Sequence, residues 1–430
     1  MTMKPTRTPV EFYHELKKDI KKEPVKQTIT LFTSQILLLL LGIITGMINA
    51  RVLGPVGYGI TAFFYSITTF ILLFFHFGFF STSALLIAEQ KDKTLEKKLI
   101  GSSIIVTSLI GVSYSIFMLI FSFFVDSIFD TNVGWVLRYT SIILFVFPYK
   151  LLIPQMATGA NEIRLLSVFN VLPKSLYIVF ILLTLMIIPV EYYHVIVLQI
   201  FATLITVTAI LYLFHPIFDD IKRSLSTIWK KNKVYGIHLY LGHITGQSTY
   251  MLDKIFITYF VNTIQLGFYS LALMITTPMV GLSQAISTSL FKSFTDMDKI
   301  PKKVIYYNFL WLTSCIVGLV LLGKVIVALL FTEEFLPVVP LIKPLALAGF
   351  FQGMYQPYHM FLVAKGKGKW KRNLAFILAL VNLGGNIILV PLMGAMGAAI
   401  ATLLAAFSGY LLNIFYYRKY DSLHRTGTSC

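Results

Sequence analysis

Charged residues are scarce in this chain of 430 residues: they make up 13% of it, whereas 57% of it is hydrophobic. A water-soluble domain carries far more charge on its surface, so the composition excludes a soluble globular protein. The apolar residues form long continuous runs and do not alternate with polar ones, which excludes a transmembrane β-barrel. The sequence therefore predicts an all-α integral membrane protein.

Cysteines, nucleotide-binding motifs and long loops are also few or missing. Cys315 lies inside an apolar run and Cys430 is the last residue, so we expect no disulfide between them. The chain contains no G-x-x-x-x-G-K-[ST] motif, which argues against ATP as the direct energy source. Because no pattern points to covalent chemistry, we expect no enzymatic activity, no catalytic residues, no cofactor and no metal site.

The first apolar run shows how the chain crosses the membrane. Thr28 to Ala50 contains no charged residue, and a helix of this length spans a hydrocarbon core about 30 Å thick. A turn rich in glycine follows, and residues 60–88 return across the membrane. Ten further runs bring the prediction to about twelve membrane helices, with the approximate ranges 100–124, 135–158, 165–188, 194–214, 236–261, 266–291, 304–323, 340–364, 373–392 and 394–416.

Basic residues are distributed unevenly between the two ends of these helices. Nearly all Lys and Arg of the connecting segments lie on the side of the N-terminus, whereas the other side holds Arg51, Lys324 and Lys343. The positive-inside rule then predicts a multi-pass protein of the cell membrane with both termini in the cytoplasm. Because the net charge of +17 is spread over many loops, it forms no single basic surface, and we expect no nucleic-acid partner.

The chain divides into two similar parts. A basic amphipathic N-terminus (1–27) precedes six helices (28–214), and a basic amphipathic connector (215–235) precedes six more (236–416), followed by a cytoplasmic tail (417–430). Two parallel six-helix halves are related by a pseudo-twofold axis along the membrane normal. This arrangement predicts a substrate path between the halves.

Four segments carry a family resemblance. They are NARVLGPVGYGI in the first turn, YMLDKIFITYFVNTIQLGFYSLA, LLFTEEFLPVVPLIKPLALAGFF and VNLGGNIILVPLMGAMGAAIATLLA. In this order they resemble the first, seventh-to-eighth, ninth-to-tenth and eleventh-to-twelfth helix segments of Wzx-like polysaccharide-export flippases. That family shares a superfamily with multidrug-and-toxin extrusion transporters and lipid II flippases. Lipid II flippases typically have about fourteen helices, so a chain with about twelve favours the polysaccharide branch.

Charged side chains inside membrane helices are costly, and this makes them candidates for a functional site. Lys150 and Lys174 lie beside Pro148 and Pro173, where the helical hydrogen bonding is interrupted and water can enter. The other candidates are Arg138, Asp253 and Lys254 inside helices and Arg51 in the outer turn. For Arg138, one turn from a helix end, extension to the membrane surface is an equal alternative to a place in the lumen. Asp253 is the candidate for coupling to an ion.

Uncharged polar residues form two stripes on membrane helices. The seventh helix carries one continuous polar face, formed by His243, Gln247, Tyr250 and Lys254. The first helix carries polar or small residues every seven positions, including Gln35 and Asn49. Polar side chains that face lipid are costly, so we expect both stripes to line an aqueous lumen; close helix packing is the alternative on the first helix.

A lumen with several Lys and Arg residues and few carboxylates attracts an anion. We therefore expect Arg51, Arg138, Lys150, Lys174 and Lys254 to bind the diphosphate and sugars of a lipid-linked substrate. The resemblance implies a flippase that moves an undecaprenyl diphosphate-type oligosaccharide or polysaccharide repeat unit from the inner to the outer leaflet by alternating access. Its partners would be that substrate, membrane lipids and other polysaccharide-assembly proteins.

Two other functions compete with this interpretation. The first is a multidrug exporter of the same superfamily, although cationic drugs favour a cavity with several unpaired carboxylates. The second is a membrane polymerase or ligase that joins sugar repeats outside the cell. The longest outer connection, at about residues 324–340, is too short to form an outer catalytic domain, so we rank this enzyme last.

Overall fold

The computed structural model of the chain describes residues 23–425, and every regular element among them is a helix. The N-terminal half consists of α2 (Glu23–Phe74), α3 (Phe79–Ala88), α4 (Lys93–Phe121), α5 (Val125–Phe129), α6 (Gly134–Thr140), η1 (Ile143–Val146), α7 (Tyr149–Gly159), α8 (Ile163–Leu185) and α9 (Tyr192–Leu213). The connector consists of α10 (Ile221–Lys231) and the π-helical turn η2 (Asn232–Gly236). Except for its last positions, 23–27, the amphipathic segment predicted for residues 1–27 lies outside the described residues.

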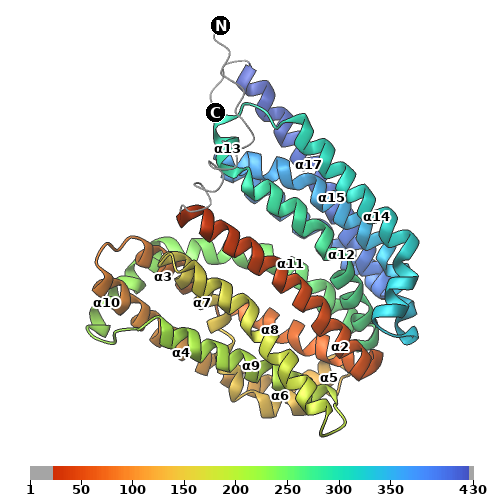
Figure 1. The fold of residues 1–430 in the computed structure, drawn as a ribbon, viewed down its shortest axis with the longest axis horizontal. Coiled ribbons are helices and arrows are strands. Elements are labelled where there is room, and N and C mark those ends of the chain that lie inside the picture. Colours follow the sequence, from red (N-terminus) through yellow and green to blue (C-terminus); the bar gives the residue numbers. More distant parts are fainter. Residues whose placement is uncertain (1–22, 426–430) are drawn as a thin grey trace, which may run out of the picture.

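The C-terminal half follows the connector. It consists of α11 (Ile237–Phe260), α12 (Thr263–Ser289), α13 (Phe291–Asp296), α14 (Lys302–Leu330), η3 (Glu333–Val338), α15 (Val339–Ala364), α16 (Gly368–Met393) and α17 (Ala395–Arg425). Figure 1 shows the two halves as separate bundles that meet along α2, α11 and α12. The last helix continues to Arg425, past the end at residue 416 that the sequence predicts.

The longest helix, α2, is two membrane crossings joined by a turn. Its apolar part, Thr30–Phe74, has 45 residues, and as one straight helix it would be about 68 Å long, more than twice the hydrocarbon core. Gly54 interrupts it with φ 62°, a left-handed backbone that glycine adopts without strain. Leu39, before the turn, lies beside Gly281 near the end of α12, and Gly78, after it, lies against Gly236 before α11. The chain therefore reverses at Gly54.

The predicted count of about twelve membrane helices is confirmed. Nine of the described helices are long and apolar enough to cross a membrane, and the bent pair Gly134–Thr140 and Ile143–Gly159, the fourth crossing in chain order, adds one more. The reversal at Gly54 divides α2 into two crossings, which brings the number to eleven. The remaining crossing is α11, whose 24 residues are long enough to span the core although its polar stripe lowers its hydropathy.

Two of the crossings are broken where the sequence predicts continuous helices. The second crossing stops at Phe74 and resumes as α3, and the break contains two left-handed residues, Phe77 with φ 44° and Gly78 with φ 79°. The fourth crossing bends by 68° between α6 and α7. The bend lies between Thr140 and Ile143, and Pro148 follows it as the N-cap of α7, where its nitrogen has no hydrogen to donate to the helix.

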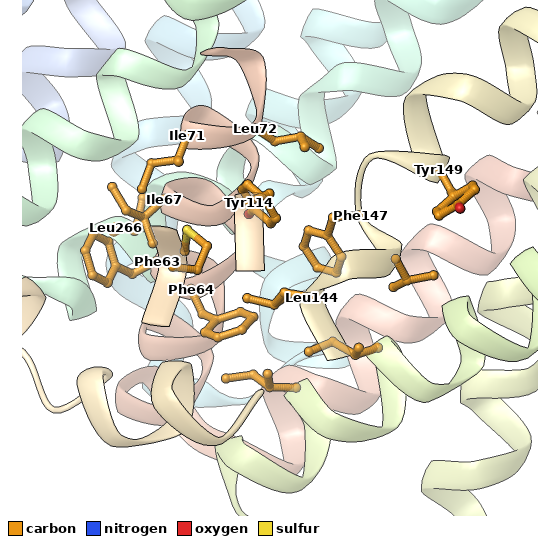
Figure 2. Close-up of a cluster of buried hydrophobic side chains, with 14 of the residues drawn as sticks. Phe63, Phe64, Ile67, Ile71, Leu72, Tyr114, Leu144, Phe147, Tyr149 and Leu266 are labelled. Atoms are coloured by element: carbon orange, nitrogen blue, oxygen red, sulfur yellow. The ribbon is translucent and has the colours of Figure 1, made fainter. Parts of the chain in front are cut away.

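A hydrophobic core joins the second crossing to both halves. Figure 2 shows Phe63, Phe64, Ile67, Ile71 and Leu72 of α2 in this core, together with Tyr114, Leu144, Phe147, Tyr149 and Leu266. The Tyr114 hydroxyl donates a 2.8 Å hydrogen bond to the Thr68 carbonyl, which satisfies the one polar atom of this fully buried ring. Because Leu266 belongs to α12, the core extends across the boundary between the halves.

The ends of the helices that carry most Lys and Arg residues lie on one side, which we call the basic side. The four ion pairs among the described residues are all there: Lys93–Glu96, Lys98–Asp220, Lys231–Glu89 and Lys299–Asp421. Two of them attach the connector to the N-terminal half, and Ile228 and the Phe79–Trp229 ring stack add apolar contact there. Figure 1 shows α10 and α13, basic-side elements of the two halves, far apart.

On the opposite side the two halves are in contact. Arg51, beside the Gly54 turn, donates hydrogen bonds to the carbonyls of Leu329 and Leu330, the last residues of α14. The Tyr58 ring packs edge-on against Phe335 with the ring centres 5.9 Å apart. Gly59 lies against the backbone of Thr263. The structure is therefore closed on the side opposite the basic residues.

This contact predicts the effect of adding one methyl group at Gly59. A Cβ atom there would overlap the Thr263 carbonyl, and overpacking of this kind costs about 1–3 kcal/mol. We expect Gly59→Ala to lower the melting temperature of the purified protein in detergent. Gly318→Ala is the control, because a Cβ at Gly318 in α14 meets nothing within 4 Å. Equal melting temperatures for the two variants would contradict the close approach of the halves.

Candidate functional site

A cavity of about 290 Å³ lies inside the N-terminal half, between α2, α7, α8 and α9. Its lining combines two ammonium groups with amides, hydroxyls and aromatic rings: Thr45, Lys150, Phe169, Asn170, Pro173, Lys174, Tyr177, Gln199 and Thr203. Of the cationic residues predicted from the sequence, the structure brings Lys150 and Lys174 together here. This cavity is the candidate binding site.

Lys150 enters the cavity from the second part of the fourth crossing. It is the second residue of α7, two residues after Pro148, and its side chain is accessible in the cavity. Its ammonium nitrogen lies 4.6 Å from the centre of the Phe147 ring, a favourable cation–π distance. The ring partly replaces water as a neighbour of the charge, but it supplies no negative charge.

Lys174 reaches the cavity from α8, directly after Pro173. Its ammonium donates a 3.2 Å hydrogen bond to the carbonyl of Leu38 on α2. Gly42 leaves room for the ammonium group, because a Cβ at that position would lie 2.9 Å from the Lys174 nitrogen. Gly42 and Gly46, which lies against Met274 of α12, therefore serve the close helix packing that a G-x-x-x-G pattern indicates.

Neither lysine of the cavity has a carboxylate partner among the described residues. Their neighbours are neutral: a ring for Lys150 and a backbone carbonyl for Lys174. A charge inside a membrane bundle that has no counter-ion is unfavourable, since the surrounding protein and lipid have a low dielectric constant. An anion that enters the cavity would therefore gain the attraction of two uncompensated positive charges.

Neutral polar residues complete the cavity, and none of them is among the residues that the sequence predicts for the site. Asn170, Lys174 and Tyr177 share one face of α8, at spacings of four and three residues, and Gln199 and Thr203 share one face of α9. The same spacing argument that identified the stripe on α11 would have found both faces. On α8 the prediction took Lys174 alone, and the α9 face contains no charged residue that would single it out.

The predicted polar residues of the first crossing have different positions. Asn49 is buried, and its side-chain oxygen accepts a hydrogen bond from the Tyr177 hydroxyl, so it fixes a residue of the cavity lining from behind. Gln35 is exposed and does not line the cavity. The stripe thus contributes to the cavity through the contact of Asn49 with Tyr177, whereas Thr45, which is not one of its positions, lines the cavity directly.

Arg51 and Arg138 lie away from this cavity. Arg51 donates hydrogen bonds to two carbonyls at the end of α14 that have no partner within their own helix. These hydrogen bonds connect the two halves. Arg138 is exposed, and its guanidinium lies 4.1 Å from the centre of the Phe123 ring. Extension of Arg138 to the membrane surface stays a prediction. A substrate contact for either residue stays a prediction.

Asp253 is the centre of a polar cluster in the C-terminal half. Its buried carboxylate accepts hydrogen bonds from the hydroxyls of Tyr269 (2.7 Å) and Thr402 (2.9 Å) and from the Asn386 amide (2.6 Å). These donors come from α12, α17 and α16. The same Asn386 amide nitrogen lies 3.1 Å from the Asn382 side-chain oxygen, and the Asn386 oxygen is buried without a hydrogen-bond partner.

The remaining predicted residues lie on α11 with Asp253. Lys254 is partly buried, and its side chain has no ion pair among the described residues. His243, Gln247 and Tyr250 belong to the same helix, but their side chains lie outside the described part of the structure. His76, which we did not select, is buried, and its Nδ1 accepts a hydrogen bond from the Gly78 backbone.

Two six-helix halves with a charged cavity inside the bundle define a two-lobed, multi-pass membrane transporter. Residues 25–298 match the family of polysaccharide biosynthesis proteins, and the chain belongs to that family. No curated protein matches the chain in sequence. The family therefore rests on the match over 25–298.

Solved structures with the same fold are distant in sequence. The lipid II flippase MurJ in an inward closed conformation is 18% identical, with 91% of this chain and 87% of that chain covered and a TM-score of 0.69. A multidrug resistance MATE family transporter in an inward-facing conformation is 16% identical, with 94% and 100% covered and a TM-score of 0.72. A transporter from Pyrococcus furiosus is 14% identical, with 93% and 94% covered and a TM-score of 0.61. At these identities the similarity shows the fold.

Proposed function

We propose that this protein is a flippase that moves a lipid-linked oligosaccharide, of the undecaprenyl diphosphate type, from the inner to the outer leaflet of the cell membrane. The observation that carries the proposal is the pair Lys150 and Lys174, which line one cavity without carboxylate partners. Membership of the polysaccharide biosynthesis family supports a saccharide substrate. The similarity to the fold of a lipid II flippase supports translocation of a lipid-linked molecule.

The proposed mechanism is alternating access between the halves. The side opposite the basic residues is closed by the contacts of Arg51, Tyr58 and Gly59, and α10 and α13 are far apart on the basic side. In this state the substrate head group would reach Lys150 and Lys174 from the basic side. Breaking the closing contacts and joining the halves on the basic side would then release it on the other side, while the lipid tail stays in the bilayer.

The two lysines would lower the free-energy cost of moving the diphosphate from water into the bundle. An ionised group that enters a low-dielectric bundle without counter-charges loses more hydration energy than the site returns. Two ammonium groups already present in the cavity replace that hydration with charge-assisted hydrogen bonds. Asn170, Gln199 and Thr203 would add neutral hydrogen bonds to sugar hydroxyls. No covalent step is needed, so the proposal is transport and not enzymatic catalysis.

This proposal predicts that charge at positions 150 and 174 is required for export. We expect Lys150→Ala and Lys174→Ala each to lower translocation roughly 5- to 150-fold, as loss of 1–3 kcal/mol of attraction implies. Lys→Arg should retain more activity than Lys→Gln at both positions. The measurement is accumulation of the unflipped lipid-linked intermediate, with an immunoblot for protein abundance.

The control for these variants is Lys324→Ala, which removes an exposed lysine of α14 away from the cavity. It should translocate as the wild type does. Normal export by both alanine variants at position 150 and position 174, at normal abundance, would refute the cationic binding site and with it the proposed substrate class.

A second candidate function is export of drugs, and the fold similarity to MATE family transporters is the observation that favours it. The cavity argues against it, because its two lysines would repel a cationic drug. Protection of cells from cationic drugs, lost in Lys150→Ala, would support this candidate in place of the flippase.

We also propose that other polysaccharide-assembly proteins act with this protein, on the ground of its family alone.

We further propose that Asp253 couples transport to a monovalent cation. The carboxylate has about four lone-pair positions, and three hydrogen bonds occupy three of them. Beside it, the Asn386 oxygen is buried without a hydrogen-bond partner. Oxygen ligands of this kind suit a hard cation such as Na⁺, which would bind between Asp253, Asn386 and Thr402.

Cation binding predicts a salt-specific gain in stability. A ligand at 100 times its Kd stabilises the folded state by about 2.7 kcal/mol, so NaCl should raise the melting temperature above that in choline chloride. Asp253→Asn should abolish this difference, whereas Glu334→Gln, which changes an exposed carboxylate, should keep it. A sodium effect that persists in Asp253→Asn, or is absent from the wild type, would exclude this site.

We also propose that the basic side faces the cytoplasm. The positive-inside rule is the support, because most connecting Lys and Arg residues lie on that side. With Cys315 and Cys430 changed to Ser, a cysteine at Lys230 in the connector should react only with a reagent inside the cell. A cysteine at Asn132, before α6, should react only from outside. Both positions are exposed, and labelling of both from the same side would contradict the proposed topology.

A further inference from the structure

A groove of about 450 Å³ lies on the C-terminal half, apart from the lysine cavity. It is formed by the start of α14, the end of α15 and the last turns of α17, all on the basic side. Its lining is apolar and aromatic, with one ammonium group at the edge: Lys302, Ile305, Tyr306, Phe309, Tyr358 and Tyr417. The proposed transport function uses none of these residues.

From helix length, we place the groove at the depth where a lipid head group meets its acyl chains. Lys302 begins α14, and Phe309 lies seven residues further along the helix, which is about 10 Å. The interfacial region of a bilayer is roughly 5–8 Å thick on each side. Lys302 is therefore level with the head groups when Phe309 has reached the hydrocarbon. Tyrosines are typical of the boundary between the two, which is where Tyr306 lies.

The groove is accessible from the bilayer. Tyr306 and Phe309 are 59% and 44% exposed, and further along α14 the apolar residues Val317, Val320 and Leu321 are exposed as well. Such a surface faces lipid in a membrane protein. The floor of the groove is fixed, since the Tyr417 hydroxyl accepts a hydrogen bond from the Ile300 backbone and the rings of Tyr358 and Tyr417 pack 5.2 Å apart.

Lys302 gives the groove its charge preference. Among the described residues it forms no ion pair, whereas nearby Lys299 is paired with Asp421 at 3.3 Å. An unpaired ammonium above an apolar groove complements a phosphate above an acyl chain. A zwitterionic lipid would bring its own positive group close to Lys302, whereas a lipid with a single negative head group would not.

The same combination recurs beside the groove. A second groove of about 450 Å³ is lined by Arg372, Phe376, Ile377 and Tyr416, at the basic-side ends of α16 and α17. Tyr416 and Tyr417 are adjacent, so they point about 100° apart, and each faces a different groove. One basic group, aromatic rings and an apolar wall thus occur on two faces of the end of α17.

We propose that the groove between α14, α15 and α17 binds an anionic phospholipid of the inner leaflet, with its phosphate at Lys302 and an acyl chain along Tyr306 and Phe309. The lipid is a resident ligand of the C-terminal half and not the transported substrate. Its binding would hold the ends of α14, α15 and α17 together on the side where the two halves separate.

The test measures lipid binding by native mass spectrometry of the full-length protein. Purified protein is titrated with phosphatidylglycerol or with phosphatidylcholine of the same acyl chains. We expect wild-type protein to retain phosphatidylglycerol preferentially. Lys302→Gln should weaken this binding about fivefold, which corresponds to the loss of one Lys contact at a membrane surface. Phe309→Ala should weaken binding of both lipids.

The matched control is Lys303→Gln, which removes the neighbouring charge that does not line the groove. It should bind phosphatidylglycerol as the wild type does. Equal binding by wild type and Lys302→Gln would overturn the proposal, and so would equal losses in Lys302→Gln and Lys303→Gln, which would indicate diffuse attraction. A polyprenyl phosphate that displaces phosphatidylglycerol at equal concentration would assign the groove to the substrate instead. None of these outcomes depends on translocation, so the flippase proposal is tested separately.

Discussion

The absence of water inside a membrane bundle is the constraint on which this structure depends. Every polar group that lies there must find a partner in the protein or face an aqueous space. Asp253 meets most of this requirement, with hydroxyl and amide donors from three helices within 2.9 Å. Lys150 and Lys174 meet less of it, since a ring and one carbonyl are the neighbours that the structure gives them. The contrast separates a carboxylate held by three protein donors from two cations that have no carboxylate partner among the described residues.

The contact between the halves on the side opposite the basic residues also depends on partners for polar groups, together with steric fit. Arg51 donates to carbonyls at the end of α14 that have no partner within their own helix. Gly59 lets the backbone of the second crossing approach Thr263 without an intervening side chain. These contacts add to the hydrophobic core that the halves share, where Tyr58 packs on Phe335 and Leu266 of α12 lies with residues of α2. The hydrogen bonds and the close backbone approach can be exchanged for others when the halves move.

Local signals were sufficient to predict most of the fold. The lengths of the apolar runs predicted the membrane crossings. The glycine and proline residues of the first turn predicted the reversal at Gly54, where the structure has φ 62°. The break at Phe77 and Gly78 was not predictable, because no proline marks it and it packs against Gly236, far along the chain. Similarly, α17 extends to Arg425 because its aromatic residues Tyr417 and Tyr420 pack on Phe361 of α15.

The site could be predicted from the sequence where a single residue is energetically unfavourable inside a membrane helix. A lysine beside a proline in a membrane helix indicated Lys150 and Lys174, and the structure places them in one cavity. The role of Arg51 was not accessible in the same way, since its acceptors are almost 280 residues away in the chain. The partners of Asp253 on α16 and α17 are likewise more than 130 residues away. Sequence spacing identifies a polar face, but the helix that will meet it is decided by tertiary packing.

If the proposed orientation and substrate are correct, the two lysines also determine how the membrane potential acts. A diphosphate linkage carries about two negative charges, which the ammonium groups of Lys150 and Lys174 would balance, so the loaded cavity crosses the field nearly neutral. The empty cavity returns with two positive charges. A potential of 100 mV, negative inside, contributes about 2.3 kcal/mol for each charge that crosses it completely. The potential would therefore drive the return of the empty binding site to the cytoplasmic side, and the loaded step would depend on substrate binding.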